Sequence, residues 1–300
     1  MFTGCGTALV TPLKSDGSLD EATLRKLIRR QIEQGIDYLV PCGTTGESPT
    51  LEESEHLRVI EIAIEESKGK VPVLGGAGSN NTRHVVHLTK EVTKLGVDGI
   101  LSVTPYYNKP TQEGLIEHYK EIASATKLPI IVYSVQPRTN VNIEPATIVK
   151  LSKISNIIGV KEASGSVAQV ASIVYRISPD FLVISGDDSV TLPVISLGGK
   201  GVISVVSNEI PGEMTQLTKL ALKGDFEDAR KIQAKFQALM EVNFIESSPG
   251  PVKAAMAMMG LMEANYRLPI VMPKPESQDK IRNVLKECGL LEQRSLSSVG

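Results

Sequence analysis

The sequence predicts an α/β protein that folds as a closed (β/α)8 barrel, the TIM-barrel architecture. Short apolar runs rich in β-branched residues alternate with amphipathic segments of helical periodicity along most of the chain. There are eight runs of each kind, the number that a closed parallel barrel requires. No low-complexity linker interrupts the alternation, so we expect one continuous barrel.

Each strand is expected where a short apolar run lies between turn-forming residues. The expected strands are Gly6–Thr11, Tyr38–Pro41, Val71–Gly75, Gly99–Thr104, Ile130–Tyr133, Ile157–Lys161, Leu182–Ser185 and Gly201–Ser204. The helices expected between and after them are Asp20–Gln34, Glu52–Ser67, Thr82–Leu95, Gln112–Ala125, Pro145–Lys153, Ser166–Ile177, Ser189–Leu197 and Pro211–Leu222. An open doubly wound sheet is the alternative, but no glycine-rich dinucleotide motif follows the first strand.

The alternation ends after the eighth helix. Three more helical segments follow with no strand between them: Asp225–Val242, Pro251–Met259 and Pro275–Cys288. We therefore expect a barrel in residues 1–224 and a helical extension in residues 225–291 that packs on the barrel or forms a subunit interface. The polar residues 292–300 are expected to be a disordered tail.

Composition restricts the class of partner. The net charge is −2, so the chain has no basic excess with which to bind nucleic acid. The three cysteines are widely spaced and form no metal-ligand pattern, which favours a reducing compartment and no metal site. We see no signal peptide and no membrane-spanning run. These features predict a cytoplasmic enzyme that binds small molecules and copies of itself.

Lys161 is the leading catalytic candidate because it ends a buried strand. The working face of a parallel barrel is the carboxyl end of its strands. Period-two alternation that points Lys161 into the barrel also points Gly159 and Ile157 inward, and Ile158 and Val160 toward the helices. A desolvated neutral amine can attack a carbonyl and form a Schiff base. The alternatives are a lysine that extends to water or one that pairs with Glu162.

Further candidates lie at the carboxyl ends of other strands. Tyr133 points inward by the same parity and can relay protons beside an amine, although a buried tyrosine that only packs is as common. The loop with Thr44 and Thr45 has glycines on both sides and can bind a carboxylate, a weak signal by itself. Arg138 can clamp a carboxylate or simply lie on the surface. His84 and His87 lie three apart on a helix but lack a third metal ligand.

Taken together, the motifs resemble the dihydrodipicolinate synthase family of pyruvate-dependent Schiff-base aldolases. They occur in one order from about Thr3 to Leu291: GTALVTP, GTTGES, TPYYNKP, the strand-five tyrosine, GVKEASG, SGDD and GGKGVIS. The resemblance implies condensation of pyruvate with L-aspartate 4-semialdehyde, the first committed step toward diaminopimelate and lysine. It also implies that no cofactor is needed, since Lys161 forms a covalent imine with pyruvate.

The same resemblance assigns the remaining roles. Tyr133 matches the proton-shuttling tyrosine, and Thr44 matches the hydroxyl that links it to Tyr107, which reaches in from a neighbouring subunit. Thr45 matches the residue that holds the pyruvate carboxylate, and Arg138 matches the arginine that receives the semialdehyde carboxylate. Backbone positions that line the pocket are matched by Gly186 and Ile203. The implied assembly is a homotetramer, a dimer of tight dimers.

Two departures from the family pattern stand out. The family reads Tyr-Asn-Val-Pro-x-Arg-Thr at the mouth, but here the segment is Tyr133-Ser134-Val135-Gln136-Pro137-Arg138-Thr139. Because proline restrains itself and the residue before it, we expect a redirected Arg138 and weaker semialdehyde binding. The changed loop also leaves open a related pyruvate aldolase for sialic or 2-keto-3-deoxy sugar acids, although Thr44 and Arg138 favour the synthase.

The second departure concerns feedback inhibition. The allosteric lysine site of the family is matched by Ser48, His56, Asn80 and Tyr106. His84 stands where a glutamate usually meets the ammonium group of the lysine. A partly charged imidazole repels that group, so we expect weak or absent lysine inhibition.

Overall fold

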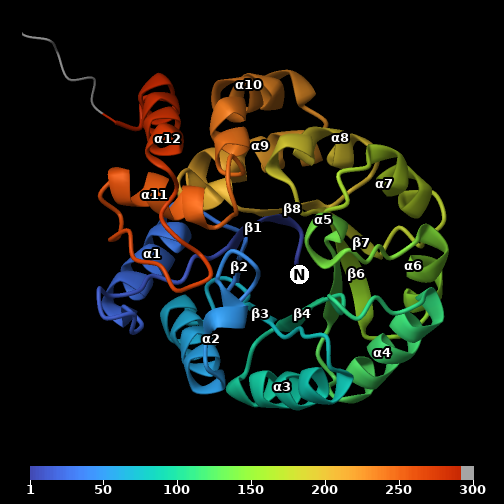
Figure 1. The fold of residues 1–300 in the computed structure, drawn as a ribbon. Helices are drawn as coiled ribbons and strands as arrows, with labels where there is room; N and C mark the ends of the chain where they lie inside the picture. The colour runs from blue at the N-terminus through green and yellow to red at the C-terminus, as the bar shows by residue number, and fades with distance from the viewer. Residues whose placement is uncertain (292–300) are drawn as a thin grey trace, which may run out of the picture.

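A computed structural model describes residues 1–291 of the chain, and the predicted tail lies outside this range. Eight parallel strands form one sheet in the order β2-β1-β8-β7-β6-β5-β4-β3. A parallel bridge between Leu39 and Val73 joins the two ends of this order and closes the ring. Figure 1 looks into the ring of strands, with the helices around it. The predicted (β/α)8 barrel is therefore confirmed.

The elements follow the predicted order. The strands are β1 Gly4–Ala8, β2 Tyr38–Val40, β3 Leu74–Gly76, β4 Gly99–Val103, β5 Ile130–Ser134, β6 Ile157–Glu162, β7 Leu182–Ser185 and β8 Gly201–Ser204. The helices that follow them are α1 Glu21–Glu33, α2 Glu53–Ser67, α3 Thr82–Leu95, α4 Gln112–Ser124, α5 Gln136–Thr139, α6 Pro145–Leu151, α7 Val167–Val174, α8 Thr191–Ser196 and α9 Pro211–Leu222. Short 3₁₀ turns are η1 Ser48–Thr50, η2 Asp188–Val190 and η3 Val206–Asn208.

Some local predictions were wrong. The first strand was predicted as Gly6–Thr11, but it begins at Gly4 and ends at Ala8. The sequence reading also placed no helix at Gln136–Thr139, where α5 forms with Pro137 in its first turn. Proline is tolerated there because the first-turn amides have no partner within the helix.

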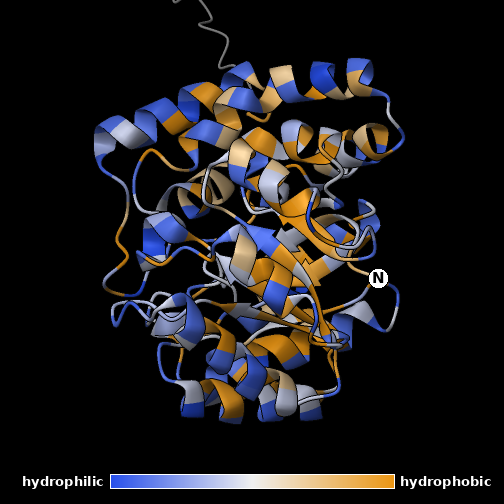
Figure 2. Ribbon diagram, turned by 90° about the vertical axis from the view of Figure 1, so that its right-hand side faces the viewer, coloured by the Kyte–Doolittle hydropathy of each residue, from blue (hydrophilic) through white to orange (hydrophobic). Residues whose placement is uncertain are grey.

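Alternate residues of the strands face two different apolar layers. Ile131 and Tyr133 pack with the barrel interior, whereas Val132 packs outward against the helices. The predicted parity fails at the start of β6, where Ile157 belongs to the outer layer and Ile158 packs with the interior. The pairing of β5 with β6 skips one residue at this point, which reverses the faces. Figure 2 shows the apolar strands inside and the more polar outer helices.

The three predicted C-terminal helices are present as α10 Phe226–Val242, α11 Gly250–Met258 and α12 Pro275–Glu287. Helix α10 packs against α9 of the barrel and against α12, and α11 packs against α12 (Figure 1). Phe236 of α10 and Ile281 of α12 belong to the same apolar cluster as the outer barrel residues. The boundary near residue 224 stays a prediction. Within residues 1–291, no helix is both long and apolar enough to cross a membrane.

Candidate active site

Lys161 and Tyr133 lie side by side at the carboxyl ends of β6 and β5. The two residues are partners in the parallel pairing of these strands, and both are buried. The Nζ atom of Lys161 lies 4.2 Å from the centre of the Tyr133 ring. The register from Gly159 onward restores the predicted inward direction of Lys161. A buried amine beside a phenol can attack a carbonyl and exchange protons with the adduct.

Glu162 is not the partner of Lys161. Its Oε1 accepts hydrogen bonds from the Ser164 amide at 2.8 Å and from Gln169 Nε2 at 3.2 Å. Its Oε2 accepts from Ser164 Oγ at 3.0 Å. Burial raises the pKa of the Glu162 carboxyl, and these three donors oppose the rise. The alternative of a barrel ion pair with Glu162 therefore does not describe Lys161.

Gly186 leaves open the space next to the amine. A Cβ atom at this position would lie 3.1 Å from Cε of Lys161 and 2.6 Å from Cβ of Ala163. Ile203 lies on β8 with its side chain in the interior layer. Neither residue is among those that line the cavity beside Tyr133, so their part in the substrate site stays a prediction.

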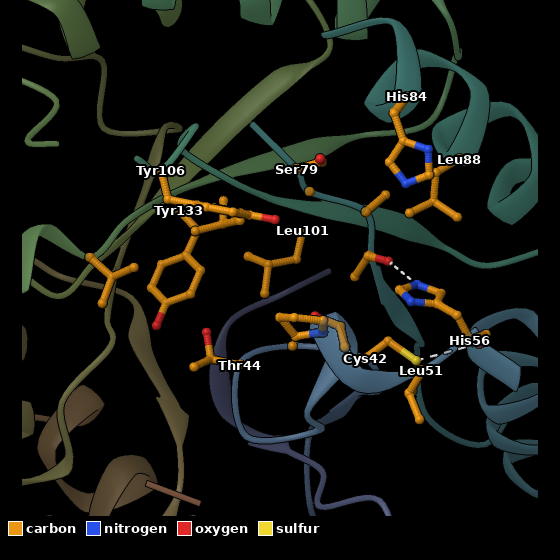
Figure 3. A pocket seen from close by; sticks show the side chains of 18 of the residues that line it. Cys42, Thr44, Leu51, His56, Ser79, His84, Leu88, Leu101, Tyr106 and Tyr133 are labelled. Carbon is orange, nitrogen blue, oxygen red and sulfur yellow. Dashed lines mark hydrogen bonds between the residues drawn. The ribbon is translucent and has the colours of Figure 1, made fainter. Parts of the chain in front are cut away.

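The Thr44–Thr45 loop follows β2 on the same side of the barrel. Figure 3 shows the hydroxyl groups of Thr44 and Tyr133 pointing toward one another. Thr45 is buried. A buried hydrogen bond holds this loop to the segment after β1: Oγ1 of Thr11 donates to the Gly46 carbonyl at 2.7 Å. The structure thus brings Thr44 to the mouth near Tyr133, whereas Thr45 is not among the residues that line the cavity there.

Arg138 lies on α5 at the rim of the same opening. Its Nη2 donates to the Ser248 carbonyl at 3.1 Å, so the C-terminal extension holds the guanidinium. Arg138 remains exposed and lines the cavity. The remaining donors of the guanidinium fork suit a carboxylate.

A cavity of about 590 Å³ joins the mouth of the barrel to a region lined by α2 and α3. At one end it is lined by Thr44, Tyr133 and Arg138. The cavity is also lined by four residues considered for the lysine site, Ser48, His56, His84 and Tyr106. Figure 3 shows His56 and His84 on the side away from Tyr133, and Tyr106 beside Tyr133. A volume of this size accommodates small organic molecules.

The predicted allosteric residues differ in their surroundings. His56 is buried, and its Nε2 contacts the Gly76 carbonyl at 2.7 Å. Burial lowers the pKa of this imidazole. Asn80 is not among the residues that line the cavity, and its carbonyl accepts a hydrogen bond from Asn108 Nδ2 at 2.8 Å. The lysine site therefore stays a prediction.

Tyr107 does not join the other candidates within one protomer. Its side chain is 89% exposed, and its φ of 74° is unusual for a residue other than glycine. It does not line the cavity, whereas its neighbour Tyr106 does. Within one protomer Tyr107 therefore lies apart from the cavity, and its predicted role stays a prediction.

Sequence reasoning missed a buried ion pair beneath the threonine loop. Nζ of Lys253 on α11 lies 2.6 Å from Oε1 of Glu47, and both side chains are almost fully buried. Burial lowers the pKa of Lys253, and Glu47 opposes this change. Glu47 stands inside the GTTGES motif, but its partner is 206 residues away. A charged residue in the apolar segment Pro251–Met259 was the only available signal.

No metal site was found within residues 1–291, where no group of three histidine, cysteine or acidic side chains is placed to hold an ion. His84 and His87 do not form a pair of ligands. Instead, Nε2 of His87 contacts Glu53 at 2.9 Å.

The comparisons with known proteins agree with this geometry. The model of the dihydrodipicolinate synthetase family matches residues 1–288. The 4-hydroxy-tetrahydrodipicolinate synthase of Koribacter versatilis is 52% identical over 98% of each chain. The dihydrodipicolinate synthase structure from Aquifex aeolicus superposes with a TM-score of 0.94 at 46% identity, covering 96% of this chain and 99% of that one.

A further solved structure is the chloride-inhibited dihydrodipicolinate synthase of Acinetobacter baumannii complexed with pyruvate. It has a TM-score of 0.95 at 40% identity and covers 97% of this chain and 100% of its own. The fold, the order of the motifs and these matches lead to one assignment. The chain belongs to the dihydrodipicolinate synthetase family.

Proposed function

We propose that this protein condenses pyruvate with L-aspartate 4-semialdehyde to form 4-hydroxy-tetrahydrodipicolinate, the first committed step of diaminopimelate and lysine biosynthesis. The observation that carries the proposal is the buried amine of Lys161 against the ring of Tyr133. Relatives about half identical over nearly the whole chain are named for this activity. They do not favour the alternative of a sialic or 2-keto-3-deoxy sugar acid aldolase.

The proposed chemistry begins at Lys161. Its neutral amine attacks the C2 carbonyl of pyruvate, and loss of water from the carbinolamine leaves an imine. The relay of Tyr133, Thr44 and Tyr107 takes up the proton lost from C3, and the resulting enamine forms a bond from C3 to the aldehyde carbon of the semialdehyde. The new alkoxide takes a proton from Tyr133. The amino group of the semialdehyde then attacks the imine carbon, which closes the ring and returns the amine of Lys161.

The other residues bind and orient the substrates. Thr45 holds the pyruvate carboxylate beside the backbone at Gly186 and Ile203, and Arg138 receives the carboxylate of the semialdehyde. Thr44 passes protons between Tyr133 and the phenol of Tyr107. Because the lysine imine is the electron sink of this reaction, the chemistry requires no metal or organic cofactor. We also propose a cytoplasmic location, which the free cysteines Cys5, Cys42 and Cys288 favour.

The covalent step has a direct test. Borohydride reduction in the presence of pyruvate is expected to leave a pyruvyl group on the Lys161 peptide, identified by mass mapping. Lys161→Arg, which keeps the charge, is expected to give no adduct. An adduct at another lysine, or none in the wild-type protein, contradicts the mechanism. Consumption of the semialdehyde with pyruvate separates the synthase from a sugar-acid aldolase, which instead releases pyruvate from its substrate.

The proposed assembly is a homotetramer built as a dimer of tight dimers, in which Tyr107 completes the site of a neighbouring subunit. The support is the 89% exposure of Tyr107 on a protomer whose other site residues lie at the barrel mouth. Subunits carrying Tyr133→Phe and subunits carrying Tyr107→Phe are each expected to be impaired. Mixed dimers regain one intact site if Tyr107 acts on its neighbour. No regain of activity in verified mixed dimers would contradict the shared site.

A further inference from the structure

The C-terminal helix α11 reaches the threonine loop through an ion pair that is shielded from water. Lys253 Nζ and Glu47 Oε1 are 2.6 Å apart, and the two side chains are 0% and 2% exposed. Removing two charges from water is costly, and such a pair is often no more stabilising than apolar side chains of the same size. A contribution to the free energy of folding therefore does not by itself explain why these two charges are buried together.

Glu47 lies at a backbone turn in the loop that carries Thr44 and Thr45. Its φ of 55° places it in the left-handed region, which a residue other than glycine adopts only where its surroundings hold it. Its amide donates to the Thr44 carbonyl at 3.1 Å, and its own carbonyl accepts from the Thr50 amide at 2.9 Å. Because these backbone hydrogen bonds join Glu47 to Thr44, a shift of Glu47 would also move the loop that carries the threonines.

The same part of the extension also contacts the other side of the mouth. The Ser248 carbonyl, just before α11, accepts a hydrogen bond from Arg138 Nη2 at 3.1 Å. Tyr266 bonds to the first residue of α11, with its hydroxyl donating to the Gly250 carbonyl at 3.2 Å. Nζ of Lys253 lies 5.1 Å from the centre of the Tyr266 ring. The segment from Ser248 to Lys253, which includes the start of α11, therefore contacts both Arg138 and the loop that carries Thr44 and Thr45.

We propose that Glu47 and Lys253 are positioning residues, which hold the Thr44–Thr45 loop in the position that pyruvate binding requires. A short ion pair in a dry site fixes both distance and direction, whereas apolar side chains of similar volume pack without a fixed direction. The C-terminal extension thereby becomes part of the active site instead of a separate packing element. The inference rests on the proposed pyruvate chemistry, and it adds a function for two residues that touch no substrate.

The test separates positioning from folding. In the double variant Glu47→Gln/Lys253→Met neither residue is left as an unpaired buried charge, so we expect it to fold with a thermal midpoint near that of the wild-type protein. The pyruvate concentration that gives half-maximal borohydride trapping at Lys161 is expected to rise about tenfold, a loss equivalent to roughly 1.4 kcal/mol of binding. Trapping at saturating pyruvate is expected to remain complete, because Lys161 and Tyr133 are untouched.

Two further variants keep the result interpretable. Glu47→Asp retains the charge but shortens the side chain, and it is expected to raise half-saturation for pyruvate severalfold even if the double variant does not fold. Asn243→Ala is the matched control, since it removes a buried 2.6 Å hydrogen bond to Glu209 away from the cavity. It is expected to lower the thermal midpoint without changing half-saturation.

The outcomes distinguish the two proposals. Normal half-saturation in a folded double variant, or in Glu47→Asp, overturns the positioning role while leaving the Schiff-base mechanism intact. A rise in half-saturation that Asn243→Ala reproduces at equal loss of stability also overturns it, because the effect is then one of stability. Absence of any Lys161 adduct in the wild-type protein removes the proposed function and this inference with it.

Discussion

The amine of Lys161 lies 4.2 Å from the centre of the Tyr133 ring, and the two residues are paired partners on adjacent parallel strands. Parallel register places such partners side by side with their side chains on the same face of the sheet. The phenol is therefore beside any group bound to the amine. This relationship gives the two residues separable tasks.

Tyr133→Phe is expected to retain the pyruvyl adduct at Lys161 but to lower kcat by roughly 10²- to 10⁴-fold, the usual contribution of a general acid or base. The ring that packs beside the amine is kept, and only the hydroxyl is lost. Steady-state kinetics together with borohydride trapping measure the two effects. A kcat close to that of the wild-type protein would show that the phenol does not move the proton.

Gly186→Ala is expected to slow imine formation. The added methyl group would lie 3.1 Å from Cε of Lys161 and 2.6 Å from Cβ of Ala163, so it crowds the amine. Gly114→Ala on α4 is the matched control, because its nearest contact would be an ordinary 3.4 Å from Pro110. Stopped-flow measurement of the reaction with pyruvate provides the comparison. Equal rates in the two variants would exclude crowding at Gly186.

Restoring the usual mouth sequence with Ser134→Asn, Gln136→Pro and Pro137→Ala is expected to lower KM for the semialdehyde and to leave KM for pyruvate unchanged. The reason is that the shifted proline lies in the first turn of α5, the short helix that carries Arg138. Arg138→Ala in both backgrounds tests whether the gain depends on the guanidinium. An unchanged semialdehyde KM in the restored loop would remove the suggested link between Pro137 and substrate binding.

Lysine is expected to inhibit the wild-type enzyme weakly or not at all, and His84→Glu is expected to increase the inhibition. His84 lines the cavity, where a carboxylate would attract the ammonium group of lysine. Initial rates at increasing lysine concentration measure the effect, with rates in the absence of lysine as the control. Sub-millimolar inhibition of the wild-type enzyme would contradict this expectation.

Stability is expected to fall as pH rises from 4.5 toward about 8 because of Glu209. Burial raises the pKa of this carboxyl from 4.5 to about 8. Repulsion by Asp188 adds to the rise, while the Asn243 hydrogen bond and Arg30 oppose it. The folded state thus holds a proton that the unfolded state has released. The stability that this proton supplies is complete below pH 4.5 and is lost as pH rises through about 8.

The expected slope from this one group is up to roughly 1.4 kcal/mol per pH unit. Urea unfolding across this window is expected to show a shallower slope for Glu209→Gln than for the wild-type protein, since the amide does not titrate. Parallel slopes in the two proteins would mean that Glu209 is already ionised in the fold.

Much of the fold was readable from local patterns. The alternation of strand and helix predicted the barrel, and the parity of β5 predicted the inward direction of Tyr133. The predicted inward direction was correct for Lys161 and wrong for Ile157, because the skipped residue at the start of β6 reverses only the residues before Gly159. The catalytic role of Lys161 stays a proposal. Such a skip is decided by pairing with a neighbouring strand, which periodicity within one strand does not report.

The sequence by itself determined the barrel and the inward direction of Tyr133 and Lys161 at the ends of β5 and β6, because period-two and helical burial are local properties of the chain. Only the tertiary structure decided that Lys253 pairs with Glu47 and that Arg138 meets Ser248, contacts that span 206 and 110 residues. Their partners are selected by packing of the C-terminal helices on the barrel mouth. No spacing in the sequence records that packing, so the amine of Lys161 was predictable while the support of the loops around it was not.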